Sequence, residues 1–119
     1  MNDDYYCDSI LSGRVPVKVV AETANVLAFH HVFPSWETHI VVIPKKHIRS
    51  LVEVEDLGLF AELFQVVVRI IKDQGFGDSN YKVITNGGSY QSNPHLHIHL
   101  VSGKPLNPES PAQKGELAV

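Results

Sequence analysis

The chain has 119 residues, of which 44% are hydrophobic and 19% charged, and its formal net charge is −3 with neutral histidines. This size and composition are typical of one globular domain, and the negative charge excludes a global basic field that would attract nucleic acid. Every apolar stretch is far shorter than the ~20 residues that a membrane-spanning helix needs. We therefore expect one domain over residues 1–119, with no nucleic acid and no membrane among its partners.

The sequence also indicates a cellular compartment. Its single cysteine, Cys7, allows no intramolecular disulfide, which is consistent with a reducing environment. The segment from Met1 to Cys7 carries two aspartates and no basic residue, unlike a secretory signal peptide. We therefore expect a cytoplasmic protein.

Short apolar and β-branched runs, separated by turn residues, predict the strands. A short helix at residues 8–11 precedes them. Residues 22–25 form a predicted hairpin turn, and Pro44 ends the third strand because proline donates no hydrogen bond to a sheet ladder. The five predicted strands lie at residues 17–21, 26–29, 38–43, 81–85 and 95–101.

One long amphipathic helix is predicted over residues 53–74, where apolar side chains recur at steps of three and four residues. Gly75 and Gly77 should end it. Short, mostly hairpin-linked strands with one long helix indicate an α+β fold, with the helix covering one face of an antiparallel sheet. Residues 104–119 are predicted to be an extended tail. The recurring apolar residues of the helix are Leu57, Phe60, Leu63, Phe64, Val67, Ile70 and Ile71.

The seven histidines are concentrated in residues 30–47 and 95–99. Side chains alternate between the two faces of a strand, so His95, His97 and His99 should share one face, about 6.5–7 Å apart. Three imidazoles in a row would line one wall of a cleft. The intervening apolar residues should pack on the long helix; they are Leu96, Ile98 and Leu100.

Spacing alone leaves three interpretations of this histidine run. A neutral imidazole is a good nucleophile toward phosphorus, and neighbouring imidazoles can donate to phosphate oxygens, which favours phosphoryl chemistry. Alternate histidines on a strand are also common zinc ligands, so a zinc enzyme with His95, His97 and His99 as ligands is a second interpretation, although three side chains along a straight strand diverge. The third is a polar strand that faces water.

The residues also resemble a known family. Residues 95–101, His-Leu-His-Ile-His-Leu-Val, match the signature of the histidine triad (HIT) family at every position. Residues 26–30 and 38–47 resemble the family's second and third strands, and Asn86 with Gln91-Ser92 resembles the loop before the triad. Over residues 4–104 the chain is most similar to the Hint branch, the purine nucleoside phosphoramidases.

That resemblance implies a HIT-like fold of five antiparallel strands with one long and one short helix, and a homodimer whose two sheets join. It also implies hydrolysis of a nucleoside 5′-phosphoramidate or a related nucleotidyl conjugate, releasing a nucleotide such as AMP, with no cofactor required. His97 would attack the α-phosphorus and form a nucleotidyl-histidine intermediate, which water would then hydrolyse.

The resemblance assigns further roles. His99 would contact the α-phosphate, Ser92 would donate to the phosphate or the leaving group, and Asn86 would hold the phosphate side of the nucleotide. His39 would orient the cluster near His97. The implied catalytic residues are His95, His97, His99, His39 and Ser92. The implied nucleotide-binding residues are Phe29, His30, His31, Val32, Asn86, Gln91, Ser92, His97 and His99.

Two departures from the family pattern bear on the pocket. His31 stands where the family usually has an aspartate that accepts hydrogen bonds from the ribose hydroxyls. Asn93-Pro94 precedes the triad in a shortened loop, and Pro94 removes a backbone donor. These departures give weight to a nucleotide-binding or scaffolding module with vestigial catalysis. A dinucleoside polyphosphate hydrolase of the Fhit type is a further alternative.

A structural zinc site is also implied by the resemblance. Many bacterial relatives carry a Cys-X-X-Cys motif near the N-terminus, and these cysteines bind zinc together with two histidines. Here the first cysteine is replaced by aspartate, whose carboxylate can still ligate zinc. The ligand set would be Asp4, Cys7, His47 and His95, and the alternative is a vestigial Cys7 beside a His47–His95 hydrogen bond.

Overall fold

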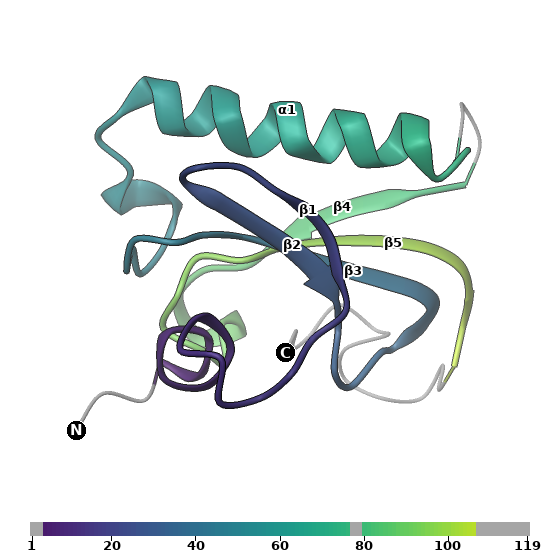
Figure 1. Ribbon diagram of the computed structural model, residues 1–119, viewed down its shortest axis with the longest axis horizontal. Helices are drawn as coiled ribbons and strands as arrows, with labels where there is room; N and C mark the ends of the chain where they lie inside the picture. Colours follow the sequence, from purple (N-terminus) through teal and green to yellow (C-terminus); the bar gives the residue numbers. More distant parts are fainter. Residues whose placement is uncertain (1–3, 77–79, 107–119) are drawn as a thin grey trace.

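The computed structural model describes residues 4–76 and 80–106. Its five strands form one antiparallel sheet, as the sequence predicted, and the structure shows their order to be β1-β2-β3-β5-β4. Helix α1 (Leu57–Asp73) lies across one face of the sheet, and the short helix η1 (Tyr6–Leu11) lies on the opposite side (Figure 1). The strands are β1 (Val19–Glu22), β2 (Val26–His30), β3 (Trp36–Pro44), β4 (Lys82–Thr85) and β5 (Ile98–Pro105).

The sheet carries an apolar core on each face. The core beneath α1 holds helix residues such as Leu63 and Ile70 together with the apolar members of the histidine run. Those members, Leu96, Ile98 and Leu100, are all buried there, which confirms the predicted alternation. The second core joins η1 to β2 and β3, and it comprises Tyr6, Ile10, Leu27, Phe29, Val41 and Ile43.

Helix α1 begins later than the sequence predicted. The backbone of Asp56 is extended, and its Oδ1 accepts a hydrogen bond from the Gly58 N–H at 2.8 Å, so Asp56 is the N-terminal cap. Residues Leu51–Glu53 form a separate helical turn, η2, in which Glu53 Oε1 accepts from the Arg49 N–H at 3.0 Å. Aspartate is a strong capping residue, and its position decides where the helix starts.

The end of α1 lies at a glycine, as predicted. Gly75 has a φ of 70°, a left-handed conformation that glycine adopts without steric cost. The Gly75 N–H donates to the Lys72 carbonyl at 3.2 Å and the Phe76 N–H to the Ile71 carbonyl at 3.1 Å. These paired bonds are a Schellman motif. Gly77, the second predicted stop, lies outside the described residues.

The apolar surface of α1 is wider than the face that the sheet covers. Leu57 is 77% exposed, Phe64 42% and Val68 48%. The sequence periodicity placed Leu57 and Phe64 on the packed face, and for these two residues it was wrong. The core contacts instead come from a narrower stripe centred on Leu63, Val67 and Ile70.

Other boundaries also differ from the prediction. Strand β5 begins at Ile98 rather than His95, and it continues through Lys104 and Pro105, which the sequence placed in the tail. Residues 107–119 of the predicted tail lie outside the described residues. Pro44 is the last residue of β3 and pairs with Val26, a terminal position where proline is tolerated.

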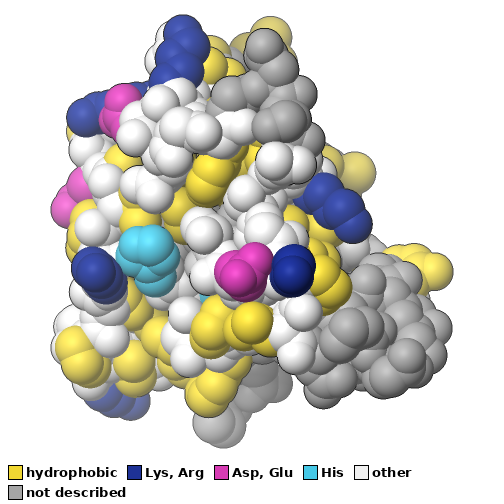
Figure 2. All heavy atoms as spheres, turned by 90° about the vertical axis from the view of Figure 1, so that its right-hand side faces the viewer, with side chains coloured by type: hydrophobic (Ala, Val, Ile, Leu, Met, Phe, Trp, Pro, Cys, Tyr) yellow, Lys and Arg dark blue, Asp and Glu magenta, His cyan; other side chains and the backbone are white. Residues whose placement is uncertain are grey.

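Surface charge is dispersed at the end of the molecule where α1 finishes. On that face, acidic and basic side chains are scattered among hydrophobic ones and in places adjoin each other, without a continuous basic area in the part of the chain that is described (Figure 2). Within residues 4–76 and 80–106, no helix has the length and apolar character needed to cross a bilayer.

Candidate active site

Four imidazoles form a buried row on the side of the sheet where η1 lies. The ring centroids of His97 and His99 are 4.9 Å apart, those of His99 and His39 are 5.0 Å apart, and those of His39 and His31 are 4.4 Å apart. His99 lies opposite Val41 in the β3–β5 register, so His39 and His99 share a sheet face. The structure thus brings together residues from three separate parts of the sequence.

The hydrogen bond between His39 and His99 has a defined direction. The Ser35 N–H donates to His39 Nδ1 at 2.9 Å, so a neutral His39 carries its proton on Nε2. That Nε2 lies 2.8 Å from His99 Nδ1 and donates to it. His99 must then carry its own proton on Nε2, a buried atom that has no hydrogen-bond partner among the described residues. The relay therefore presents an N–H donor to a ligand.

Both rings of this relay are neutral at physiological pH. Burial, reinforced by the neighbouring imidazoles, lowers the pKa of His39 to about 3 and that of His99 to about 2. Each ring therefore has only one proton to place, which makes the tautomer assignment unambiguous. The row offers polarised N–H groups rather than fixed positive charge.

His97 has the opposite tautomer. Its Nδ1 lies 2.6 Å from the His95 carbonyl and donates to it, which leaves the lone pair of a neutral ring on Nε2. The Tyr6 ring packs beside it at 5.2 Å between centroids, and Thr85 Oγ1 donates to the His97 carbonyl at 3.0 Å. A neutral His97 therefore holds its Nε2 lone pair on the ring next to His99.

Two buried amides add to the unsatisfied donors. Asn86 Nδ2 and Asn93 Nδ2 are buried and have no hydrogen-bond partner among the described residues. Asn86 directly follows Thr85, the last residue of β4, which is paired with Ile98. Donor groups of this kind match the oxygens of an anion.

A pocket of about 230 Å³ opens beside the row. The pocket surface is mainly apolar and aromatic, which matches the usual character of a small-molecule site. It contains Phe29, His31, Val32 and Ser92 from the predicted nucleotide-binding set. The residues that the sequence reasoning missed are Tyr5, Tyr6, Phe33 and Asn93. For Tyr5 and Tyr6, the sequence offered one signal, namely two adjacent aromatic residues at the start of η1.

Five residues of the predicted nucleotide-binding set lie outside this pocket lining, and they are His30, Asn86, Gln91, His97 and His99. His30 is paired with Ile40, whose side chain is in the core beneath α1, so His30 lies on the opposite sheet face from Phe29. Gln91 Nε2 donates to the Arg49 carbonyl at 2.5 Å. Side-chain alternation along β2 is by itself sufficient to separate His30 from Phe29.

His95 differs from the other triad members. The Tyr6 ring contacts both His95 and His97, but the His95 ring belongs to a second cluster and not to the row of imidazoles. His95 Nε2 lies 2.8 Å from the Pro44 carbonyl and donates to it, while Nδ1 lies 2.6 Å from Asp4 Oδ2. His95 therefore serves the row of imidazoles through its backbone carbonyl and the second cluster through its side chain.

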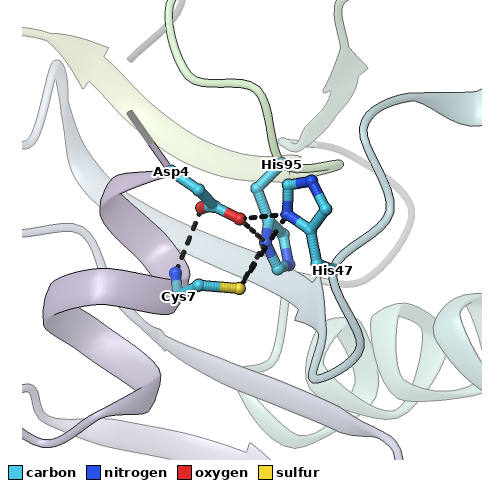
Figure 3. A group of neighbouring side chains, drawn as sticks. All are labelled: Asp4, Cys7, His47 and His95. Carbon is cyan, nitrogen blue, oxygen red and sulfur yellow. Dashed lines mark hydrogen bonds and ion pairs between the residues drawn. The ribbon is translucent and has the colours of Figure 1, made fainter. Parts of the chain in front are cut away.

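The second cluster consists of Asp4 and Cys7 at η1, His47 after β3, and His95, whose side chains converge (Figure 3). Asp4 Oδ2 lies 2.5 Å from His47 Nδ1, and Cys7 Sγ lies 3.4 Å from His95 Nδ1 and 4.0 Å from His47 Nδ1. All four potential ligand atoms lie within 4.8 Å of one another. These are donor atoms of the types that bind zinc.

Proton accounting indicates that this cluster holds a cation. Because His95 Nε2–H donates to Pro44, a neutral His95 turns its Nδ1 lone pair toward the Asp4 carboxylate, which also has only lone pairs. Burial alone would raise the pKa of Asp4, but hydrogen bonds with Cys7, His95 and His47 lower it to about 2, so the carboxylate is ionised. A proton on the ring or a metal ion must separate these acceptors. The residues therefore fit a zinc ion.

The row His31–His39–His99 has the same residue types but a different proton balance. Its ligand atoms also lie within 4.8 Å of one another. Yet backbone N–H groups occupy Nδ1 of both His31 and His39, the former from Phe33 at 2.9 Å. The lone pairs are used within the protein, so this row is a hydrogen-bonded relay and not a metal cage.

Comparison with known proteins agrees with this geometry. The chain matches the family model of the HIT domain over residues 12–106. It is 37% identical to an uncharacterized 13.2 kDa HIT-like protein from Azospirillum brasilense, over 83% of this chain and 85% of that protein.

Solved structures are similar over most of the fold. A histidine triad protein from Clostridium difficile has a TM-score of 0.77 at 36% identity, covering 91% of this chain and 96% of that one. A HIT family hydrolase from Legionella pneumophila has a TM-score of 0.76 at 31% identity, covering 87% of this chain and 96% of that one. The buried histidine row, the sheet that carries it and these likenesses together establish that the protein belongs to the HIT family.

Proposed function

We propose that the protein is a nucleotide-binding hydrolase that cleaves nucleoside 5′-phosphoramidates, or related nucleotidyl conjugates, through a nucleotidyl intermediate on His97. The observation that carries this proposal is the pair of opposed tautomers. A neutral His97 holds a lone pair on Nε2, and the adjacent His99 holds an N–H on Nε2. One ring is thus prepared to attack phosphorus and the other to bind its oxygens. The neighbour from Legionella pneumophila, described as a hydrolase, adds support.

The reaction would proceed in two displacements. In the first, His97 Nε2 forms a bond to the α-phosphorus as the bond to the leaving nitrogen breaks, and the departing amine takes a proton. Ser92 lines the pocket, and we propose that its hydroxyl passes a proton from solvent to the departing amine. In the second, water attacks the phosphorus and releases a proton to solvent. The bond between phosphorus and His97 Nε2 breaks at the same time, and its electron pair returns to Nε2 as the lone pair.

The surroundings stabilise both stages. The intermediate places positive charge on the His97 ring, and the His95 carbonyl, 2.6 Å from Nδ1, faces that charge. Charge on the phosphoryl oxygens is met by N–H of His99 and by the amide of Asn86. Donors held in place before the reaction lower its barrier, because they need not reorganise. No metal is required for these steps.

The proposed ligand is a purine nucleotide such as AMP. The aromatic walls of the pocket, formed by Tyr5, Tyr6, Phe29 and Phe33, suit the flat apolar surface of a base. The buried row of imidazoles at one side suits the phosphate. This arrangement also allows a dinucleoside polyphosphate, so substrate class must be decided by assay.

A direct assay tests the proposed function. The protein is incubated with a fluorogenic adenosine 5′-phosphoramidate, with and without a chelator, beside the His97→Ala variant and with diadenosine polyphosphate as the competing substrate. We expect turnover that survives chelation and falls by at least about 1,000-fold in the variant, since the nucleophile is removed. Nucleotide binding without any turnover would instead indicate a binding or scaffolding module, which the His31 and Pro94 departures would explain. Loss of turnover on chelation would point to a zinc enzyme.

We also propose a homodimer formed through α1 and the edge strand β4. The exposed residues of α1 follow helical spacing, so Leu57, Phe64 and Val68 lie on one side of the helix. Tyr81 and Val83, at and beside the edge strand β4, are exposed as well. An apolar stripe next to an open strand edge is the kind of surface that a second copy would cover, extending the sheet across the dimer.

We further propose that Asp4, Cys7, His47 and His95 bind a structural zinc ion. Support comes from the converging donor atoms and from the acceptor groups that need a cation between them. When bound, zinc would neutralise this cluster and tie η1 to the loop after β3. Burial and the nearby Asp4 carboxylate raise the pKa of the Cys7 thiol to about 12 without a metal, and thiolate ligation would release its proton.

A further inference from the structure

One segment of four residues contributes side chains both to the candidate metal cluster and to the pocket. Asp4 and Cys7 are three positions apart and turn their side chains into the cluster. The two residues between them, Tyr5 and Tyr6, line the pocket. The two pocket residues lie between the two cluster residues in a single turn of chain. A displacement of this turn would therefore change the cluster and the pocket wall together.

A second connection runs through the loop before β5. Asn93 lines the pocket, and its Oδ1 accepts a hydrogen bond from the Tyr5 N–H at 3.1 Å. His95 contributes its ring to the cluster and its carbonyl to His97 Nδ1. The Tyr6 ring contacts both His95 and His97, at 5.9 and 5.2 Å between centroids. The cluster is therefore joined to the pocket wall and to the nucleophile.

The cluster is also open to solvent on one side. The His47 side chain is 49% exposed, whereas that of Asp4 is fully buried. His47 lines a groove that also carries four carboxylates, Glu53, Glu55, Asp56 and Glu62, with one lysine, Lys46. Such a groove favours the approach of a divalent cation over that of an anion. A metal at this cluster could therefore enter and leave while the protein stays folded.

We propose that metal occupancy of the Asp4–Cys7–His47–His95 cluster sets the nucleotide affinity of the pocket, so that the metal is an effector of the site as well as a structural element. This inference rests on the proposed zinc site and the proposed nucleotide pocket. With zinc bound, η1 is fixed, and Tyr5 and Tyr6 are held in place before the base arrives. Without zinc, the nucleotide must itself order this wall, and its binding weakens by that amount.

Calorimetry with AMP as the ligand tests this coupling. The full chain is stripped with a chelator, dialysed, and measured with and without one equivalent of zinc chloride. We expect the Kd for AMP to be about tenfold lower in the zinc-loaded protein. Thermodynamic linkage requires the zinc Kd, measured by competition with a chromophoric chelator, to fall by the same factor when AMP is saturating.

Variants separate the metal from the pocket. His47→Ala removes a ligand that does not line the pocket, so this variant should bind zinc weakly and should bind AMP like the stripped wild type at every zinc concentration that loads the wild type. Lys46→Ala changes the neighbouring residue, which is not a ligand, and should keep both affinities within about twofold of the wild type.

Three results would overturn the inference, and they are distinguishable. Stoichiometric zinc binding with the same Kd for AMP in both forms refutes the coupling and leaves the zinc site and the pocket in place. Absence of zinc binding by the wild type refutes the metal site. Absence of AMP binding in both forms refutes the pocket and, with it, the proposed function.

Discussion

His39 Nε2 donates a hydrogen bond to His99 Nδ1 across 2.8 Å, and the Ser35 N–H behind His39 fixes the direction of that bond. A backbone group therefore decides which nitrogen of His99 carries a proton, although His99 is 64 positions further along the sequence (99 − 35). The consequence is an N–H donor beside the lone pair of His97.

His39 acts as a positioning residue, so its replacement should affect kcat more than KM. His39→Leu removes the donor to His99 Nδ1, and His99 can then take the wrong tautomer; we expect kcat to fall by about 10–100-fold. His39→Gln keeps an N–H donor and should recover much of this loss. Steady-state kinetics of the two variants check this. Equal losses in both would show that His39 acts only through packing.

The neutral relay should make stability depend on pH. The pKa values of His39 and His99 are lowered to about 3 and about 2 in the folded protein, while an unfolded histidine titrates near its ordinary value of 6.5. The unfolded chain therefore binds more protons below pH 6.5, so the stabilisation is present above that pH and is lost progressively as the pH falls toward 3.

Urea unfolding between pH 7.5 and 4.5 measures this effect. Each of the two histidines contributes a slope of up to about 1.4 kcal/mol per pH unit to the free energy of unfolding. His39→Gln should reduce the slope by about one histidine's share. A free energy of unfolding that does not change over this range, or a slope that is the same in the variant, would contradict the prediction.

His31 should control the choice between ribose and deoxyribose. Its Nδ1 already accepts from the Phe33 N–H, so this nitrogen cannot also accept a hydrogen bond from a ribose hydroxyl. A ribose hydroxyl pair needs an acceptor for its protons. We expect the wild type to hydrolyse adenosine and 2′-deoxyadenosine phosphoramidates with similar kcat/KM, and His31→Asp to prefer the ribose form by about tenfold. A strong ribose preference in the wild type would exclude this role.

The apolar stripe of α1 should govern assembly. Phe64→Lys places a charge in the proposed interface and should shift the protein to monomer at micromolar concentration, because an unpaired buried charge is costly. Val52→Lys is the matched control, since Val52 is 92% exposed and lies outside the stripe. Size-exclusion chromatography with light scattering reads the mass. A monomeric wild type, or a Phe64→Lys dimer, would refute the interface.

The histidine run and its neighbours show how far the sequence could lead. Alternation correctly assigned Leu96, Ile98 and Leu100 to the core beneath α1. The same rule, applied to β2, would have separated His30 from Phe29. Alternation does not reveal that the His95 ring joins Asp4, 91 positions away in sequence, instead of the row of imidazoles.

The sequence by itself determined the secondary-structure elements and the position of the histidine run. Periodicity gave α1 and the strands, and the motif at 95–101 identified His97 and His99, because these signals depend on neighbours along the chain. Only the tertiary structure decided how protons are distributed and what encloses the ligand. Three tertiary contacts illustrate this: the Ser35 N–H donates to His39, the tyrosines at the start of η1 line the pocket, and the Asp4 carboxylate meets the His95 ring. Hydrogen bonds and pocket walls of this kind form only when packing brings distant residues together, and local pattern carries no record of that packing.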